Sequence, residues 1–174
     1  SGGGRPEEGH TYVKTATCCD TYAYVLASLD QNRPTILWGP SGCGKSALMK
    51  SLKRLRHQDD MLTVHMHKSM DSRSLVGTYV CTSQAGEFQW KQGPLTIAAL
   101  KGKWLCIEEI NAAPQEALAL LASVAESGLI SVPGRGLLRA KPGFMIFGLC
   151  TQETGSTASL SYCDKHLLRR VWAY

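Results

Sequence analysis

The clearest indication of the fold is Gly39-Pro-Ser-Gly-Cys-Gly-Lys-Ser46, which follows the apolar run Thr35-Ile-Leu-Trp38. It matches the phosphate-binding pattern G-x-x-x-x-G-K-[ST] at every fixed position. The run before it is typical of a buried strand, and residues 46–57 place apolar side chains at helical spacing. A glycine-rich turn between a strand and a helix presents backbone N–H groups and the positive end of a helix dipole to an anion. The stretch therefore predicts a phosphate-binding loop.

The residues of this loop have distinct expected roles. Lys45 is expected to reach the β- and γ-phosphates of ATP, and the Ser46 hydroxyl is an expected ligand of Mg²⁺. The alternative is a glycine-rich turn with an exposed lysine and no ligand. The residues expected to bind ATP or ADP are Gly39, Pro40, Ser41, Gly42, Cys43, Gly44, Lys45, Ser46 and Ala47.

Strands and helices alternate along the rest of the chain. Apolar strands are expected at residues 62–67, 104–107, 144–150 and 171–174, helices at 71–76, 94–100 and 114–126, and hairpins within 77–92 and 130–138. This alternation predicts an α/β fold: a P-loop core with a five-stranded parallel sheet sandwiched between helices in three layers (α/β/α), with inserted β-hairpins. Residues 1–14 are expected to be a flexible segment or an expression scar, and residues 15–174 a single nucleotide-binding domain.

Two acids follow the strand expected at residues 104–107. In Trp104-Leu-Cys-Ile-Glu108-Glu109, the first acid is expected to help hold Mg²⁺ and the second to polarise the attacking water. Such a Walker B strand usually ends in Asp-Glu, and Glu108 is one methylene longer than Asp. Because Mg²⁺ demands near-octahedral geometry, this change predicts weakened or rearranged metal binding. The alternative is a pair of surface acids that end a strand.

Composition excludes several classes of protein. The 174 residues are 44% apolar with charges of both signs interspersed, which is typical of a globular domain. The net charge of +5 is too mild to indicate a nucleic-acid binder, so direct RNA contact is not expected. No apolar run approaches the roughly 18 residues of a membrane span. The seven cysteines are scattered and form no C-x-x-C pattern, which argues against a disulfide framework or a zinc site. This cysteine usage favours a reducing compartment. His65-Met-His67 has no further metal ligand at a suitable spacing.

A more specific resemblance runs through residues 35–147. Its segments are similar to the dynein-related subfamily of AAA+ ATPases: Ser74-Leu-Val-Gly-Thr-Tyr79, Gly86-Glu-Phe-Gln-Trp90, Gly93-Pro-Leu95, Lys103-Trp-Leu105, Glu109-Ile-Asn-Ala-Ala113, Ile130-Ser-Val-Pro-Gly-Arg-Gly136 and Pro142-Gly-Phe144. The likeness is strongest to the branch of that subfamily that works in ribosome assembly.

The resemblance implies that this chain is one module, the first, of a pseudo-hexameric ring of AAA modules within one very long chain. Such a machine uses ATP to remove assembly factors from precursors of the large ribosomal subunit, in the nucleolus and nucleoplasm. The helical lid that usually follows the fifth strand is not expected within these 174 residues.

Three departures from the family pattern concern hydrolysis rather than phosphate binding. Glu108 stands where Asp is usual, and Thr151 stands where Asn is usual at the end of the strand expected at 144–150. A single hydroxyl clamps a water less well than a planar amide. Arg169 or Arg170 is a candidate arginine finger, with Arg170 preferred, although a solvated or salt-bridged pair is an equal alternative.

The expected catalytic residues are therefore Glu109, Thr151 and Arg170, with Ser46 and Glu108 as metal ligands. We expect a module that binds nucleotide and hydrolyses it slowly or not at all. One alternative is a ring spacer or partner-docking module that binds no nucleotide. A weaker alternative is a small-molecule kinase, which the missing Arg-rich lid and the Glu108-Glu109 pair disfavour.

Overall fold

A parallel four-stranded sheet forms the centre of the molecule. The computed structural model describes residues 16–31, 33–57, 60–83 and 86–152. The strands are β1 (Thr35–Pro40), β2 (Leu62–His65), β5 (Trp104–Glu108) and β8 (Met145–Gln152), and they lie in the order β1-β8-β5-β2. All three pairings are parallel, so each strand points its carboxyl end to the same edge of the sheet. The fifth strand, expected at residues 171–174, lies outside the described residues.

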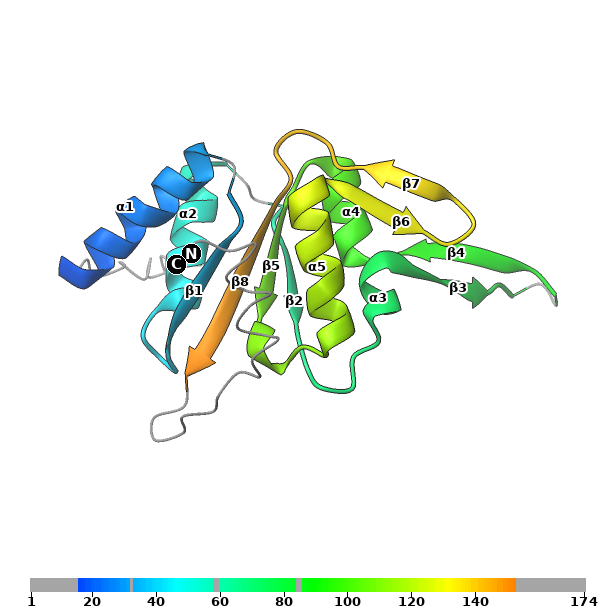
Figure 1. Ribbon diagram of the computed structural model, residues 1–174, viewed down its shortest axis with the longest axis horizontal. Helices are drawn as coiled ribbons and strands as arrows, with labels where there is room; N and C mark the ends of the chain where they lie inside the picture. Colours follow the sequence, from blue (N-terminus) through cyan, green and yellow to red (C-terminus); the bar gives the residue numbers. More distant parts are fainter. Residues whose placement is uncertain (1–15, 32, 58–59, 84–85, 153–174) are drawn as a thin grey trace, which may run out of the picture.

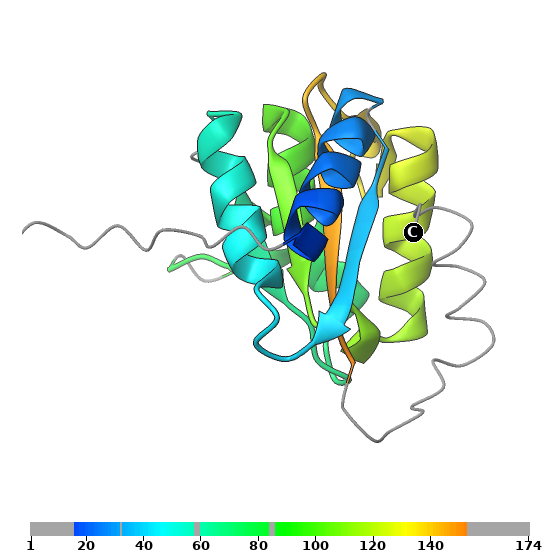
Figure 2. The same ribbon diagram turned by 90° about the vertical axis from the view of Figure 1, so that its left-hand side faces the viewer.

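Helices cover both faces of this sheet, which confirms the expected three layers (Figures 1 and 2). On one face, α1 (Ala16–Asp30) and α2 (Lys45–Leu55) bury a cluster that includes Val25, Leu52 and the sheet residue Phe147. On the other face, α3 (Ser72–Val76), α4 (Pro94–Lys101) and α5 (Gln115–Ser127) pack against a second cluster centred on Ile107 and Ile146. Because both faces of the sheet are covered, β1, β5 and β8 contain continuous apolar runs, whereas the edge strand β2 (Leu-Thr-Val-His) does not.

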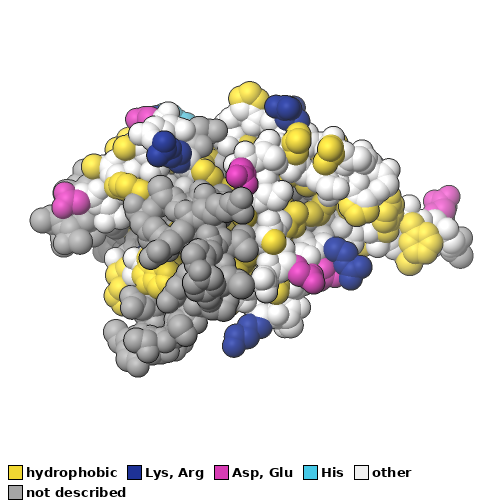
Figure 3. Space-filling view, in the orientation of Figure 1, with side chains coloured by type: hydrophobic (Ala, Val, Ile, Leu, Met, Phe, Trp, Pro, Cys, Tyr) yellow, Lys and Arg dark blue, Asp and Glu magenta, His cyan; other side chains and the backbone are white. Residues whose placement is uncertain are grey.

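Two antiparallel hairpins extend from the core, as expected. The first joins β3 (Gly77–Cys81) to β4 (Phe88–Gln92), and the second joins β6 (Leu129–Val132) to β7 (Gly136–Arg139). Apolar side chains gather over this end of the molecule, where Tyr79, Phe88 and Leu137 are exposed (Figure 3). None of the helices in the described ranges has both the length and the apolar character needed to cross a membrane.

Several element bounds differ from those expected. β2 ends at His65 rather than continuing to residue 67, and β8 runs to Gln152, two residues beyond the expected end. α2 begins at Lys45, directly after Gly44, so its first turn belongs to the glycine-rich loop. These shifts place His65 and Thr151 at the carboxyl edge of the sheet, where ligands of open parallel sheets bind.

Candidate functional site

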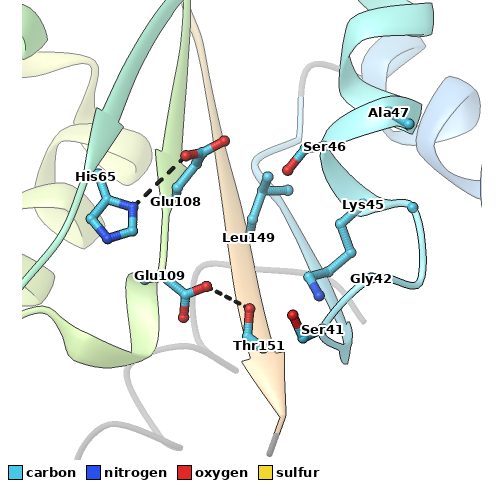
Figure 4. A pocket seen from close by; sticks show the side chains of 11 residues that line it. Ser41, Gly42, Lys45, Ser46, Ala47, His65, Glu108, Glu109, Leu149 and Thr151 are labelled. Atoms are coloured by element: carbon cyan, nitrogen blue, oxygen red, sulfur yellow. Dashed lines mark hydrogen bonds and ion pairs between the residues drawn. The ribbon is translucent and has the colours of Figure 1, made fainter. Parts of the chain in front are cut away.

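The glycine-rich loop, the two acids and Thr151 meet at the carboxyl edge of the sheet (Figure 4). They surround a cavity of about 280 Å³. Its lining residues are Ser41, Gly42, Gly44, Lys45, Ser46, Ala47, His65, Glu108, Glu109, Leu149 and Thr151. Gly39, Pro40 and Cys43 belong to the loop but do not line the cavity, and the candidate fingers Arg169 and Arg170 lie outside the described residues. The sequence therefore located most of the residues that the structure brings together here.

Glycines allow the loop to turn back on itself. Gly42 and Gly44 have φ angles of +77° and +94°, in the left-handed region that residues with a side chain rarely adopt. A Cβ atom at Gly39 would lie 2.8 Å from the Cys43 sulfur, so the two ends of the loop approach each other closely here. The first turn of α2, from Lys45 to Ala47, consequently borders the cavity. The first N–H groups of a helix have no partner within the helix, and they suit an anion.

Lys45 is held by the loop itself. Its Nζ donates hydrogen bonds to the carbonyl oxygens of Gly39 and Pro40, both at 2.8 Å, and lies 3.8 Å from the sulfur of Cys43. These acceptors are neutral. A charged phosphate oxygen accepts a stronger hydrogen bond from an ammonium group than a neutral carbonyl oxygen does. A phosphate in the cavity would therefore compete with the two carbonyl oxygens for Lys45 Nζ.

The two acids line the same cavity because the backbone reverses between them. Consecutive side chains of a regular strand point to opposite faces. Glu109, however, follows the last residue of β5 with φ 52° and ψ 45°, a left-handed conformation that is uncommon for any residue other than glycine. It begins the short 3-10 helix η1 (Ile110–Ala112). Strain of this kind costs about 1–3 kcal/mol and clusters at functional sites.

A close fit between η1 and the sheet maintains this turn. Ile110 is fully buried and packs over Gly148 of β8, where a Cβ atom would lie 2.9 Å from the Cδ1 atom of Ile110. Because only a glycine leaves that space, Gly148 allows η1 to approach the strand closely. The position of Glu109 over the cavity therefore depends on a residue that does not line it.

Thr151 contacts Glu109 directly, as Figure 4 shows. Its Oγ1 donates a hydrogen bond to Glu109 Oε1 at 2.6 Å, the short distance typical of a hydroxyl bound to a carboxylate. Asn111, in η1, donates from Nδ2 to the Thr151 carbonyl oxygen at 3.5 Å. The sequence singled out Thr151 and Glu109 separately, but nothing in it indicated that they bind each other.

His65 is a cavity residue for which the sequence analysis predicted no role. It ends β2 opposite Glu108, and its Nδ1 lies 3.8 Å from Glu108 Oε2. The sequence could have indicated His65 by its place at the end of an expected parallel strand, because the acids and Thr151 also follow the ends of such strands. Leu149 also lines the cavity, two residues before Thr151 in β8 and so on the same face of the sheet. Within the described residues, no group of three or more His, Cys, Asp or Glu side chains is arranged to hold a metal ion.

The donors that border the cavity suit a hard cation bound together with a phosphate. The Ser46 hydroxyl and the Glu108 carboxylate lie across the cavity from each other (Figure 4). Mg²⁺ prefers such oxygen ligands and commonly takes only one or two from the protein, with phosphate and water completing its shell. Behind the cavity, burial raises the pKa of Cys150 to about 11, with the Glu109 charge adding to the rise. That thiol is therefore neutral at physiological pH and is a poor nucleophile.

Comparisons with known proteins agree with the geometry. Residues 34–171 match the AAA domain of the dynein-related subfamily. The chain is 33% identical over 140 residues to midasin from Dictyostelium discoideum and 35% identical over 118 residues to midasin from Giardia intestinalis. These matches cover 80% and 68% of this chain but only 2% of each midasin, so the chain spans a small part of those relatives.

A solved structure supports the fold. NtrX from Brucella abortus in complex with ADP superposes with a TM-score of 0.66 at 18% identity, covering 94% of this chain and 36% of that one. At that identity the likeness concerns the fold alone, and it agrees with the predicted three-layer α/β core. The family predicted from the motifs is likewise confirmed. The chain therefore belongs to the dynein-related subfamily of AAA domains, an ATPase family, and is similar to an AAA module of midasin.

Proposed function

We propose that this chain is a nucleotide-binding AAA+ module that holds ATP or ADP with Mg²⁺ and hydrolyses ATP slowly or not at all. The observation that carries the proposal is the complete phosphate loop, which opens on a cavity whose opposite wall carries Glu108 and Glu109. In this proposal the backbone of residues 39–47 surrounds the phosphates. Lys45 leaves the carbonyl oxygens of Gly39 and Pro40 and binds a phosphate instead.

Ser46 and Glu108 are the proposed ligands of Mg²⁺, which supplies positive charge beside the phosphate oxygens when it is bound. Glu109 is the proposed base that accepts a proton from the attacking water. Two features support slow turnover. Glu108 is one methylene longer than the usual Asp, which shifts the carboxylate proposed to hold Mg²⁺. The Thr151 hydroxyl donates a hydrogen bond of 2.6 Å to one carboxylate oxygen of Glu109, the proposed base. Arg169 or Arg170, with Arg170 preferred, is the proposed arginine finger and would act in the site of a neighbouring module.

For the whole protein, we propose a midasin-like machine in which this chain is the first module of a pseudo-hexameric ring. Its neighbours are the other AAA modules of the same long chain. The machine removes assembly factors from large-subunit ribosomal precursors in the nucleolus and nucleoplasm, without direct RNA contact by this module. The support for this proposal is the similarity to midasin over most of this chain.

The alternative is a ring spacer or docking module that binds no nucleotide. One observation favours it: Lys45 makes two hydrogen bonds of 2.8 Å to its own loop, so it has partners without a ligand. Calorimetric titration with ATP·Mg²⁺ and with ADP separates the two proposals.

We expect micromolar binding, about −8 kcal/mol, that is lost in Lys45→Ala. Lys50→Ala is the matched control, because it removes the same charge from an exposed position of α2 away from the cavity. ATP bound to the unmodified chain should be recovered largely intact after a long incubation. Absence of binding by the unmodified chain would favour the spacer, and rapid conversion of bound ATP to ADP would contradict slow turnover.

A further inference from the structure

A second cavity lies at the amino edge of the sheet, opposite to the glycine-rich loop. Its walls are the C-terminal end of α5, the residue before β1, and residues 139–146, which lead from β7 into β8 (Figure 1). Its volume is about 350 Å³, against about 280 Å³ for the cavity beside the loop. We refer to it as the amino-edge cavity. The two cavities share no lining residue, so nucleotide binding does not account for this one.

The amino-edge cavity has an apolar floor and a positively charged rim. Val124, Met145 and Ile146 border it from the core, and each is at most 6% exposed. Arg139 and Lys141 are exposed and border it from the solvent side. Within the described residues, no acid lines the cavity and neither of these cations forms an ion pair. An occupant that combines an apolar group with negative charge therefore fits the cavity.

Backbone hydrogen bonds hold the rim of this cavity in place. Ala140 N donates to the carbonyl oxygen of Gly128, and Lys141 N donates to that of Ala99, both at 2.8 Å. Gly128 follows the last residue of α5, and Ala99 lies in the last turn of α4, so the connection between β7 and β8 is tied to the ends of two helices. Because the walls are fixed before anything binds, ordering the site costs an occupant little free energy.

The surface beside the cavity favours a polypeptide segment over a small free molecule. Leu137 is 68% exposed and lies two residues before Arg139 in β7, so both side chains are on the same face of the hairpin. Positive and apolar side chains lie close together along the upper edge of the molecule in Figure 3. A small molecule confined to the cavity would leave Leu137 uncovered. A chain that places one side chain in the cavity would cover Leu137 with its neighbouring residues.

We propose that the amino-edge cavity docks a segment of a partner protein in which a bulky apolar side chain is flanked by Asp or Glu residues. The apolar side chain occupies the floor formed by Val124, Met145 and Ile146, and the flanking carboxylates pair with Arg139 and Lys141. Buried apolar anchors supply most of the affinity of such contacts, and charges at the rim supply orientation and salt-dependent attraction. The docking does not depend on nucleotide binding, because the two cavities lie at opposite edges of the sheet.

Fluorescence anisotropy of a labelled peptide, Gly-Asp-Glu-Leu-Phe-Asp-Glu-Gly, tests the docking on the unmodified chain. We expect a dissociation constant of about 10–100 μM, which is typical of a small and transient contact. The constant should rise with salt, because the rim charges are exposed and screened. One comparison peptide carries Lys in place of the acids, and another carries Ser-Ser in place of Leu-Phe. Each should bind about tenfold more weakly or not at all.

Variants of the chain locate the contact. Reversing both rim charges, in Arg139→Glu with Lys141→Glu, should weaken binding of the first peptide about tenfold or more. The matched control is Lys50→Glu with Arg54→Glu, which reverses the same number of exposed charges on α2, over the other face of the sheet. It should change the affinity by about twofold at most. Ala125→Phe fills the cavity without changing the charge and should abolish binding. Urea unfolding checks that each variant folds.

The outcomes are distinct. Binding that needs both the acids and Leu-Phe, and is lost only in the cavity variants, supports the docking. Equal loss in the α2 control overturns it, because general attraction between charges explains that result. No binding by the unmodified chain also overturns it and leaves the nucleotide proposal untouched. Lower stability with unchanged binding in the rim variant overturns it too, since the cations then only offset the dipole of α5. If Ala125→Phe unfolds, amide NMR of the unmodified chain replaces it: peptide-induced shifts centred on Gly128 and Lys141 support the docking, and shifts elsewhere overturn it.

Discussion

A methyl group added at Gly148 is expected to disturb the turn that carries Glu109. Gly148 lies in β8 between β1 and β5, and a Cβ atom there would lie 2.9 Å from Ile110 Cδ1 and 3.0 Å from Ile36 Cγ1. Contacts this short do not persist in close-packed interiors. Ile110 is fully buried, so the contact is relieved either by a turn of its side chain within the core or by a shift of η1 away from the sheet.

The expected cost of Gly148→Ala is about 1–3 kcal/mol, the usual cost of an extra methyl in a packed core. Ile110→Val removes the Cδ1 atom that makes the closest contact and costs about 0.5–1.5 kcal/mol by itself. Together the two changes should cost about 1 kcal/mol less than the sum of the single costs, because the closest contact no longer forms.

Urea unfolding of the four proteins measures these free energies, and nucleotide titration of the same proteins reports on the site. Gly148→Ala should also weaken the Thr151–Glu109 contact, since Glu109 moves with η1. A Gly148→Ala variant as stable as the unmodified chain would show that the space beside Gly148 is not needed by Ile110. Additive costs, within about 0.5 kcal/mol, would show that Ile110 does not fill the space over Gly148.

Three further perturbations test other parts of the site. Glu108→Asp restores the acid usual in the family and should lower the Mg²⁺ concentration needed for half-maximal ATP binding; titrations at graded Mg²⁺ would contradict this if the requirement rose. Gly44→Ala puts a side chain at φ +94° and should cost about 1–2 kcal/mol in urea unfolding and abolish ADP binding, so normal ADP affinity would count against the loop geometry. Burial raises the pKa of Cys106 and Cys150 from 9.0 to about 12 and about 11. The folded chain thus keeps these protons after the unfolded chain loses them, and each thiol should remove about 1 kcal/mol of stability between about pH 9 and 10. A Cys106→Ala, Cys150→Ala variant should lack this part of the decline, and an identical pH profile would contradict it.

Most elements of the fold could be predicted from the sequence because each has a local signal. The phosphate loop depends on fixed glycine and lysine spacing, and buried parallel strands appear as short apolar runs. The order of strands in the sheet has no such signal. Thr35 pairs with Phe147 across the whole intervening chain, and only the packed structure determines that β8 lies between β1 and β5.

The candidate site also combines features that could be predicted from the sequence with features that could not. Lys45 and Ser46 were predictable because they belong to a contiguous motif. The shared orientation of Glu108 and Glu109 was not, because it requires a left-handed residue at a position where the strand pattern predicts alternation. The bond between Thr151 and Glu109 was also not predictable, since it depends on how closely η1 packs on Gly148. The roles of Arg169 and Arg170 remain predictions, as both lie outside the described residues.

A crystal structure of the chain with ADP bound is the most direct test of the central claim that residues 39–47 hold the phosphates of a nucleotide. We predict that ADP occupies the cavity between the loop and Glu108, with the β-phosphate against the first turn of α2. Lys45 Nζ should have left the carbonyl oxygens of Gly39 and Pro40 for a phosphate oxygen. Nucleotide bound elsewhere, or Lys45 still bonded to both carbonyl oxygens beside a bound ADP, would contradict it.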